Sequence, residues 1–205
     1  MIYTDGSANI SLAHDPLKAI VAPRPIGWIT AQSASGSINL SPYSFFNAVA
    51  TRPHIVSFCS ENRKDAVTFI EETREFTCSF VSRELADAMN ETSANLPRGQ
   101  SEYTHAKLDM EASRYVSPPR VSGTPAALEC KLISVLQMRD IEGALIPTFM
   151  VIGQVVGIYI DAAYLKDGRF DTAAANPVAR CGYSDYAEVN EMFCILPPGW
   201  RDRSS

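Results

Sequence analysis

Hydrophobic and polar residues alternate with a period of two along much of this chain, which is typical of β-strands. The alternation is clearest over residues 75–82, where Phe76 and Cys78 share one face and Thr77 and Ser79 share the other. Further strands are predicted at residues 26–32, 37–40, 55–60, 128–138 and 148–160. In the strand at 128–138, one face is formed by Leu128, Cys130, Leu132, Leu136 and Met138.

Turn and breaker residues predict how these strands connect. Residues 33–36, Ser-Ala-Ser-Gly, are expected to join the first two strands in a hairpin. Pro23 and Pro25 hold the entry to the first strand extended. Gly153 and Gly157 interrupt the longest apolar run, which indicates bulges or a bend where another backbone or a ligand approaches.

Two helices are predicted between the strands. Residues 64–73 form the first, with Val67 and Ile70 toward the core. Leu85, Ala86 and Met89 mark the second, and the hydroxyl of Ser82 is a candidate N-cap. Residues 92–119 follow as a long polar excursion, of a kind that is usually functional or disordered. Many strands and few helices indicate one mainly β barrel domain over residues 1–205, with peripheral helices.

Composition narrows the function classes. Eighteen basic and twenty-three acidic residues among 205 give a net charge of −5, which disfavours nucleic acid or an anionic membrane as a partner. The five cysteines are an odd number without a C-x-x-C pair, which favours reduced thiols in the cytoplasm. Residues 1–14 lack a signal-peptide pattern, and no apolar stretch has the roughly 20 residues of a membrane helix.

The common motif-bearing chemistries are also disfavoured. The sequence has no phosphate-binding G-x-x-x-x-G-K-[ST] loop, no G-x-G-x-x-G after a strand and no G-x-S-x-G elbow. His14, His54 and His105 are too scattered to predict a metal site. No catalytic residue can be assigned from the pattern, and a cofactor held on the surface of a barrel is the leading alternative.

Several segments, read in order, resemble one family. They are Pro-Arg-Pro-Ile-Gly-Trp-Ile-Thr at 23–30, Asn-Leu-Ser-Pro-Tyr-Ser-Phe-Phe-Asn at 39–47, Arg-Lys-Asp at 63–65, Met-Asn-Glu-Thr-Ser at 89–93, Pro-Ala-Ala-Leu-Glu-Cys at 125–130 and Pro-Val-Ala-Arg at 177–180. From about residue 15 to residue 195 the chain resembles the flavin reductase-like, FMN-binding split-barrel family that includes flavoredoxin. The resemblance implies a homodimer of Greek-key barrels with FMN at the subunit interface.

The residue types in these segments suit FMN. Residues 41–47 offer backbone amides, the Ser44 hydroxyl, the Asn47 amide and aromatic surface, a mixture that small-molecule sites need. Arg63 and Lys64 precede a helix whose N-terminus would attract a phosphate. By resemblance, Thr30 and Gln32 lie near that phosphate. The residues expected to bind FMN are Arg24, Thr30, Gln32, Ser44, Phe45, Phe46, Asn47, Arg63, Lys64, Asp65, Arg180 and Tyr183.

Plainer interpretations stand beside these. Residues 44–47 could be an ordinary packed strand, and Arg63 with Lys64 a solvated pair. Arg24 could contact phosphate or flavin, or pair with a carboxylate across the dimer. Arg180 and Tyr183 could be interface residues. Where the family usually has a hydroxyl residue the chain has Ala31 and Ala66, so phosphate affinity is expected to be weaker unless Arg63 and backbone amides compensate. Lys107 stands where the family commonly has glycine, which affects substrate choice.

Three functions follow from the resemblance. The first is an NAD(P)H-dependent flavin reductase that transfers hydride or electrons through bound FMN. The second is a flavin-carrying electron-transfer protein, reduced by a redox partner protein and without NAD(P)H activity of its own. The third is a structural dimer in which Ala31 and Ala66 have abolished FMN binding. The first is preferred.

Overall fold

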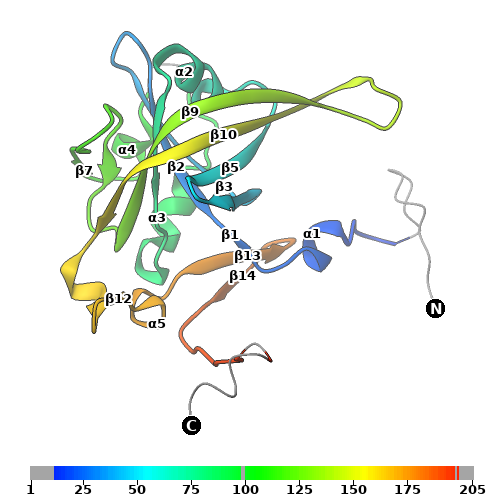
Figure 1. The fold of residues 1–205 in the computed structure, drawn as a ribbon. Coiled ribbons are helices and arrows are strands. Elements are labelled where there is room, and N and C mark those ends of the chain that lie inside the picture. The colour runs from blue at the N-terminus through cyan, green and yellow to red at the C-terminus, as the bar shows by residue number, and fades with distance from the viewer. Residues whose placement is uncertain (1–11, 98–99, 197, 199–205) are drawn as a thin grey trace.

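The protein is described here by a computed structural model that covers residues 12–97, 100–196 and 198. Its centre is a seven-stranded antiparallel sheet in the order β3-β2-β6-β9-β10-β5-β4 (Figure 1). The strands are β2 (Gly27–Gln32), β3 (Ile38–Tyr43), β4 (Phe46–Thr51), β5 (His54–Glu61), β6 (Glu75–Ser79), β9 (Ala126–Arg139) and β10 (Leu145–Ile160). The predicted strands and the predicted β2–β3 hairpin are confirmed.

The two edge strands of this sheet are consecutive in the sequence. β3 ends at Tyr43 and β4 begins at Phe46, so only Ser44 and Phe45 connect them. Because so short a link brings the two edges together, the sheet must curl into a barrel that stays open between β3 and β4. The predicted split β-barrel is therefore confirmed, and the split lies at Ser44 and Phe45.

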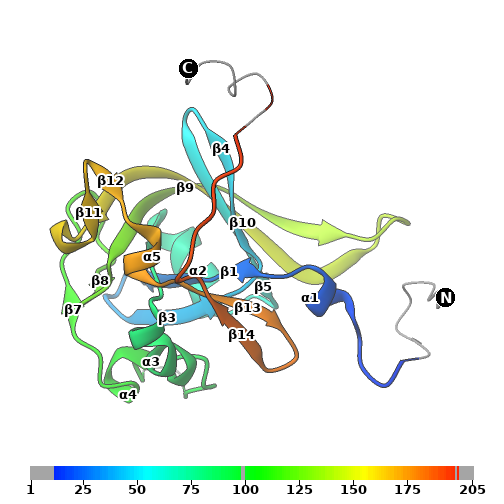
Figure 2. The same ribbon diagram turned by 90° about the horizontal axis from the view of Figure 1, so that it is seen from below.

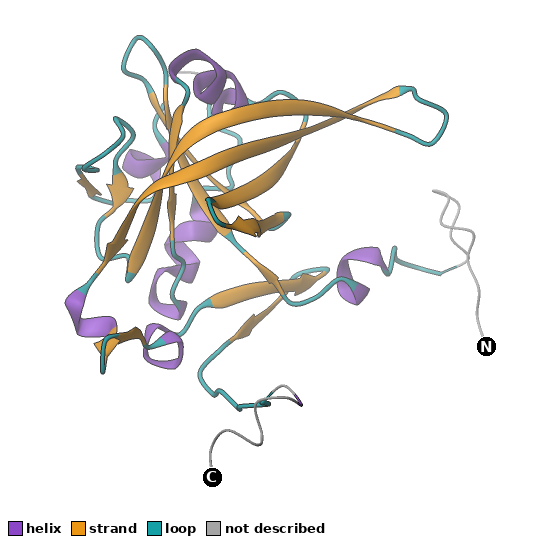
Figure 3. Ribbon diagram, viewed as in Figure 1, coloured by secondary structure: helices purple, strands orange, loops and turns teal. Residues whose placement is uncertain are grey.

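Smaller sheets surround the barrel (Figures 2 and 3). The largest has three strands in the order β1-β13-β14 and lies beneath the barrel in Figure 1. Its strands are β1 (Arg24–Pro25), β13 (Val178–Gly182) and β14 (Asp185–Glu188). Two short pairs complete the set: β7 (Met110–Glu111) with β8 (Arg120–Val121), and β11 (Leu165–Lys166) with β12 (Arg169–Phe170).

Helices are short and peripheral. They are α1 (Leu17–Ile20), α2 (Asp65–Thr73), α3 (Ala86–Glu91), α4 (Glu102–His105) and α5 (Thr172–Ala175), with 3-10 turns η1 (Arg83–Leu85) and η2 (Ala162–Tyr164). The predicted helix at 64–73 is confirmed, and its apolar stripe of Val67 and Ile70 is fully buried. The second predicted helix also forms. Ser82 lies at the cap position of η1, but its side chain makes no capping hydrogen bond.

β2 separates two hydrophobic cores because its side chains alternate between them. Ile29 packs with Phe58, Phe76 and Ile70 in the core between the sheet and α2. Trp28 packs in a second core on the opposite face. That second core also holds Leu40, Val81, Met89, Tyr103, Val121 and Val178. β2 is therefore buried on both faces, and its neighbour β3 carries the edge of the split.

The predicted single face of β9 is wrong beyond Leu132. Ser134 pairs with Ile152 and Leu132 pairs with Gly153, so Ile133 is an extra residue in β9. One extra residue exchanges the faces of every later side chain. Val135 therefore packs against the core, whereas Leu136 is 49% exposed.

The bulge or bend predicted at Gly157 is confirmed, because Val156 is an extra residue in β10, whereas the register shift beside Gly153 comes from the extra residue Ile133 in β9. Their close neighbours are aromatic rings. A Cβ atom at Gly153 would overlap the ring of Phe76, and one at Gly157 would overlap Tyr115. Beyond the bulges, the β9–β10 hairpin projects well past the barrel (Figure 1).

The predicted excursion at 92–119 is mostly irregular in its described part, with only α4 and β7 as regular elements. It covers the edge of the barrel, where Thr92 accepts a hydrogen bond from the Trp28 indole at 2.9 Å. None of the helices that the structure describes is long and apolar enough to cross a membrane. Among the same residues, no group of three or more His, Cys, Asp or Glu side chains could hold a metal ion.

Candidate functional site

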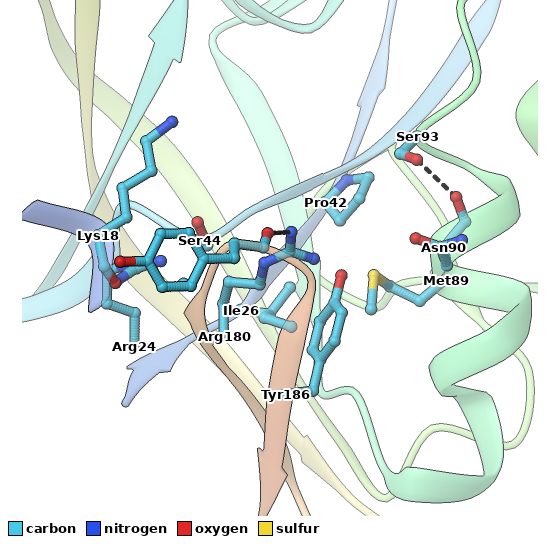
Figure 4. A pocket seen from close by; sticks show the side chains of 12 residues that line it. Lys18, Arg24, Ile26, Pro42, Ser44, Met89, Asn90, Ser93, Arg180 and Tyr186 are labelled. Carbon is cyan, nitrogen blue, oxygen red and sulfur yellow. Dashed lines mark hydrogen bonds between the residues drawn. The ribbon is translucent and has the colours of Figure 1, made fainter. Parts of the chain in front are cut away.

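A cavity of about 380 Å³ lies where β3 leaves the barrel, between α3 and the β13–β14 hairpin (Figure 4). Its lining comes from five separated parts of the chain, which only the tertiary fold brings together. The lining residues are Lys18, Arg24, Ile26, Pro42, Ser44, Met89, Asn90, Ser93, Arg180, Gly182, Tyr183 and Tyr186. Three of them are cationic and none is a carboxylate.

Arg24 is the most buried of the three cations, at 7% exposure. Its Nη1 donates hydrogen bonds to the carbonyl oxygens of Lys18 and Val21. Its guanidinium lies 5.6 Å from the ring centre of Phe45. The buried Nε has no hydrogen-bond partner among the residues described. α1 and the extended segment after it therefore hold Arg24 in place without neutralising its charge.

Arg180 lies directly opposite Arg24 in the antiparallel pairing of β1 and β13. One of its guanidinium nitrogens donates to the carbonyl oxygen of Tyr183. The same guanidinium stacks over the ring of Tyr186, 4.5 Å from the ring centre. Tyr183 turns the hairpin with a φ of 45° and is 55% exposed. The hairpin thus presents one arginine and two tyrosines to the cavity.

The rest of the wall is neutral. Ile26, Pro42 and Met89 contribute apolar surface. Asn90 and Ser93 contribute polar groups from the end of α3, where Ser93 Oγ donates to the Asn90 carbonyl oxygen at 2.6 Å (Figure 4). An apolar wall with a few fixed polar groups is the usual composition of a small-molecule site.

A second, more apolar cavity of about 540 Å³ shares Lys18, Arg24 and Ser44 with the first. Its remaining lining residues come from the segment around α1 and from β4, β5 and β10. They include Leu17, Ile20, Val21, Pro23, Pro25, Phe45, Phe46, Asn47, Ser57, Cys59 and Met150. The two cavities therefore meet at the split of the barrel.

The predicted aromatic run lines this second cavity. Phe45 is 41% exposed, and the Lys18 ammonium lies 5.8 Å from its ring centre. Phe46 packs against Gly27, where an added Cβ atom would overlap its ring. Asn47 is exposed, and its Oδ1 accepts a hydrogen bond from the Ala48 amide at 2.8 Å. These side chains are close to Ser44 and Arg24, as predicted for one site.

The start of α2 forms a separate group of predicted residues. The Arg63 guanidinium pairs with Glu71 and lies 4.8 Å from the ring centre of Phe149. Lys64 is the exposed N-cap residue of α2. Asp65 lines another cavity, of about 270 Å³, beneath the excursion. None of the three lines the two cavities at the split, so their contact with a phosphate stays a prediction.

Thr30 and Gln32 are also outside the two cavities. Thr30 is fully buried, and its Oγ1 lies 2.8 Å from the hydroxyl of Tyr103. Burial raises the pKa of the Tyr103 hydroxyl well above its usual value. Gln32 is the partly exposed last residue of β2. A phosphate contact of Thr30 stays a prediction, but it would require Tyr103 to move.

The edge of β3 beside Thr30 is closed by Glu102 of α4. Glu102 is 8% exposed and accepts hydrogen bonds from the Leu40 amide at 3.0 Å and from Asn39 Nδ2 at 2.8 Å. Burial raises the pKa of this carboxyl. These contacts fasten the excursion to the barrel.

Comparison with known proteins identifies the family of this site. The model of the flavin reductase like domain matches residues 21–174. The chain belongs to the flavin reductase-like family. A relative from Deinococcus radiodurans is 33% identical over 203 residues, covering 91% of this chain and 86% of the relative.

Solved structures agree with the family assignment. The chain is similar to component B of nitrilotriacetate monooxygenase from Bacillus cereus, with a TM-score of 0.82, 28% identity and coverage of 92% and 100% of the two chains. Flavoredoxin of Desulfovibrio vulgaris shares the fold, with a TM-score of 0.74, 21% identity and coverage of 95% and 97%. The flavin reductase-like fold and its flavin-related chemistry are therefore assigned to this chain.

Sequence reasoning missed several residues at this flavin reductase-like site. Met89, Asn90 and Ser93 were part of a family segment, so that segment could have pointed to them. Tyr186 pairs with Arg180 across the tight β13–β14 hairpin, which brings it to the cavity. Lys18 lies in a four-residue helix with no residue pattern around it, and no sequence signal marks it.

The described cysteines are all free thiols. Burial raises the pKa of Cys78 to about 12 and raises the pKa of Cys130 well above its usual value. Cys59, which lines the second cavity, also has a pKa raised by burial. A thiol with a raised pKa is a poor nucleophile. Cys59, Cys78 and Cys130 are therefore poor candidates for reactive thiols.

Proposed function

We propose that this protein binds FMN non-covalently at the split of its barrel and is an NAD(P)H-dependent flavin reductase-type oxidoreductase. The observation that carries the proposal is the pair of adjoining cavities that meet at Arg24 and Ser44. One cavity is mostly apolar and the other is cationic. The apolar cavity suits the flat, largely apolar ring of FMN, and the cationic cavity beside it would admit an anionic molecule that exchanges electrons with that ring.

The apolar cavity would hold the ring. Phe45, Phe46 and Met150 supply its wall, and Ser44 and Asn47 supply polar groups at its rim. β5 forms part of its lining and runs on to Glu61, shortly before Lys64 and the first turn of α2. We therefore expect the phosphate at the start of α2, where helix N–H groups and Lys64 favour an anion.

When bound, FMN supplies the redox chemistry, accepting a hydride or electrons and passing them on. The chain's own residues bind and orient. The excursion, fastened by Glu102 and Tyr103, excludes water from the β3 edge beside the site. Burial raises the pKa of the Cys59 thiol in the cavity, which makes it a poorer nucleophile.

The proposal includes a homodimer with the flavin between two copies. Apolar side chains are exposed on β4 and on the projecting β9–β10 hairpin, including Val49 at 56%, Leu136 at 49%, Ile141 at 102% and Leu145 at 54%. Exposed apolar surface of this kind commonly marks an interface. Sedimentation equilibrium of the purified protein should give twice the mass of the chain, and a monomer at micromolar concentration would contradict the dimer.

The proposal also includes a cytoplasmic location, which the free thiols of the described cysteines fit.

Anaerobic reduction tests the activity. The FMN-loaded protein is mixed with NADH or NADPH without oxygen, and the visible absorption of oxidised flavin is followed. Rapid bleaching by either nucleotide is the expected result. Bleaching by dithionite or a reduced ferredoxin, but by neither nucleotide, would contradict NAD(P)H dependence and would favour the electron-transfer protein.

A further inference from the structure

We propose that the smaller cavity, lined by Lys18, Arg24 and Arg180, is an anion subsite that receives the carboxylate or phosphate of the protein's second substrate. This inference rests on the proposed function, because the second substrate is the molecule that exchanges electrons with the flavin. It assigns a chemical class to that molecule: an organic anion with a flat ring.

The first argument for the anion subsite comes from the pairing of β1 with β13. Arg24 and Arg180 are directly opposite each other in an antiparallel ladder, so their side chains leave the same face. Like charges directly opposite are destabilising, whereas a charge of opposite sign between them would be stabilising. Among the residues that the structure describes, no carboxylate lies within ion-pairing distance of either arginine. An external anion would balance this pair.

The burial of Arg24 carries the second step. Its two hydrogen bonds to carbonyl oxygens satisfy one nitrogen, but they leave Nε buried without a partner in the described part of the chain. A buried charge is costly unless it is both paired and hydrogen-bonded. The chain keeps Arg24 nine-tenths buried in the cavity wall all the same, which is expected of a group that meets its counterion in a bound molecule.

The surroundings of the cavity carry the third step. Lys18 adds a third positive charge, and its ammonium lies 3.8 Å from Glu61, with both side chains largely exposed. An exposed ion pair of that kind is weak and leaves Lys18 available to a stronger partner. The chain as a whole carries a net charge of −5, so a cavity with three cations and no lining carboxylate departs from the average of the molecule.

The neutral part of the lining defines the rest of the ligand. Ile26, Pro42 and Met89 form an apolar wall, and the Tyr186 ring stands opposite Met89 (Figure 4). Arginine binds carboxylate and phosphate with two parallel hydrogen bonds, and flat rings pack well on such walls. Ser44 lines both cavities, so a molecule in this subsite would lie next to the ring-binding cavity.

Two sources share this chemistry: a nucleotide phosphate from the electron donor and an aromatic carboxylate from an acceptor. The probes are AMP and benzoate, each with a matched neutral compound, adenosine and benzamide. Each is titrated by calorimetry into FMN-saturated protein and, separately, into flavin-free protein. We expect at least one anion to bind roughly tenfold more tightly than its neutral match. AMP preference would assign the subsite to the donor, and benzoate preference would assign it to an acceptor.

Two variants test the residues. Arg180→Gln should weaken binding of the preferred anion by about tenfold, because it removes a charged hydrogen-bond donor. Lys18→Gln, at an exposed position that folding does not need, should weaken it by about threefold. The matched control is Lys131→Gln, a lysine of β9 paired with Glu75, which should change nothing.

Neutral compounds binding as tightly as the anions, no binding of either anion, or equal losses in the Lys131→Gln control would overturn the subsite. The flavin-free titration separates the two proposals. Anion binding without any FMN binding would leave the subsite standing and would contradict the proposed function. FMN binding without an anion preference would do the reverse.

Discussion

The two sides of the β2–β3 hairpin differ in whether their polar side chains have partners within the chain. On the edge covered by the excursion, two buried polar side chains find partners within the chain: the Thr30 hydroxyl lies beside that of Tyr103, and Glu102 accepts a hydrogen bond from the backbone of β3. Where the hairpin reaches the split, Arg24 and Arg180 lie opposite each other, and no carboxylate of the described residues pairs with either. Thr30 and Glu102 are therefore satisfied by the chain, whereas the proposed subsite at the open end would be completed by a bound anion.

This difference distinguishes candidate anion-binding residues that cannot be distinguished by residue type. Thr30 and Arg63 suit a phosphate as well as Arg24 does, yet Thr30 is bonded to Tyr103 and Arg63 is paired with Glu71. A charge or hydroxyl already satisfied by the chain stabilises the fold and has less to offer a ligand. Arg24, with a buried and unpartnered Nε, has the most to offer.

The largest expected effect is on anion binding, when a carboxylate of the chain itself is placed opposite Arg24. Arg180→Glu would place a carboxylate opposite Arg24, so the pair would neutralise itself. Binding of the preferred anion should fall by about a hundredfold, and the free energy of unfolding should rise by up to about 1 kcal/mol. Calorimetry and urea unfolding measure the two effects. Unchanged anion binding would contradict the subsite, and a clear loss of stability would contradict a repulsion between the two arginines.

The next effect is on the covered edge. Tyr103→Phe leaves the Thr30 hydroxyl buried without its partner, and should lower the free energy of unfolding by about 1–2 kcal/mol. The double variant Thr30→Val with Tyr103→Phe removes both partners and should recover part of that loss. A loss of FMN affinity in the double variant beyond that of Tyr103→Phe alone would support the phosphate contact predicted for Thr30, and equal FMN affinity in the two variants would contradict it.

The pH dependence of stability gives a second test of the edge of β3 that the excursion covers. Burial, helped by the charge of Asp65, raises the pKa of Glu102 from 4.5, although the hydrogen bonds from Leu40 and Asn39 oppose that rise. Because the folded pKa is above the unfolded one, the contribution of Glu102 is full below the unfolded pKa and is lost as pH rises through the folded pKa. Glu102→Gln should therefore flatten the fall in unfolding free energy as the pH rises above 4.5. An identical slope in both proteins, measured by urea unfolding, would contradict this.

The smallest effect is expected at Arg63. The exposed pair with Glu71 should contribute about 0.5 kcal/mol or less to stability, so Arg63→Gln should unfold at nearly the same urea concentration as the wild type. Lys64→Gln removes an N-cap charge that no carboxylate pairs with in the described chain, and should weaken FMN binding several-fold more than Arg63→Gln. Equal FMN affinity in both variants and the wild type would remove the phosphate from the start of α2.

Local patterns were enough to predict most of the barrel. Alternation predicted β6, turn residues predicted the β2–β3 hairpin, and the spacing of apolar residues predicted α2. Each of these signals is local in the sequence. The face of β9 beyond Leu132 could not be predicted, since a single bulge at Ile133 depends on pairing with β10. The three-stranded sheet of β1, β13 and β14 joins segments about 150 residues apart, and nothing local signals that pairing.

The site could be predicted only for residues in or near the segments that resemble the family. Arg24, Ser44 and Arg180 lie in family segments, Tyr183 was predicted shortly after the last of them, and all four line the cavity. Lys18 reaches the cavity from a short helix that carries no pattern. Arg24 and Arg180 meet through strand register, a property of the fold, and their lack of a carboxylate partner cannot be read from residue types.

The visible absorption spectrum of the purified, untagged protein, with identification of what heat releases, tests the flavin site most directly. The prediction is the absorption of a bound flavin and release of FMN. A colourless protein that also fails to bind added FMN, FAD or riboflavin would contradict the central claim, and the likeness to flavin reductases would then extend to the fold alone.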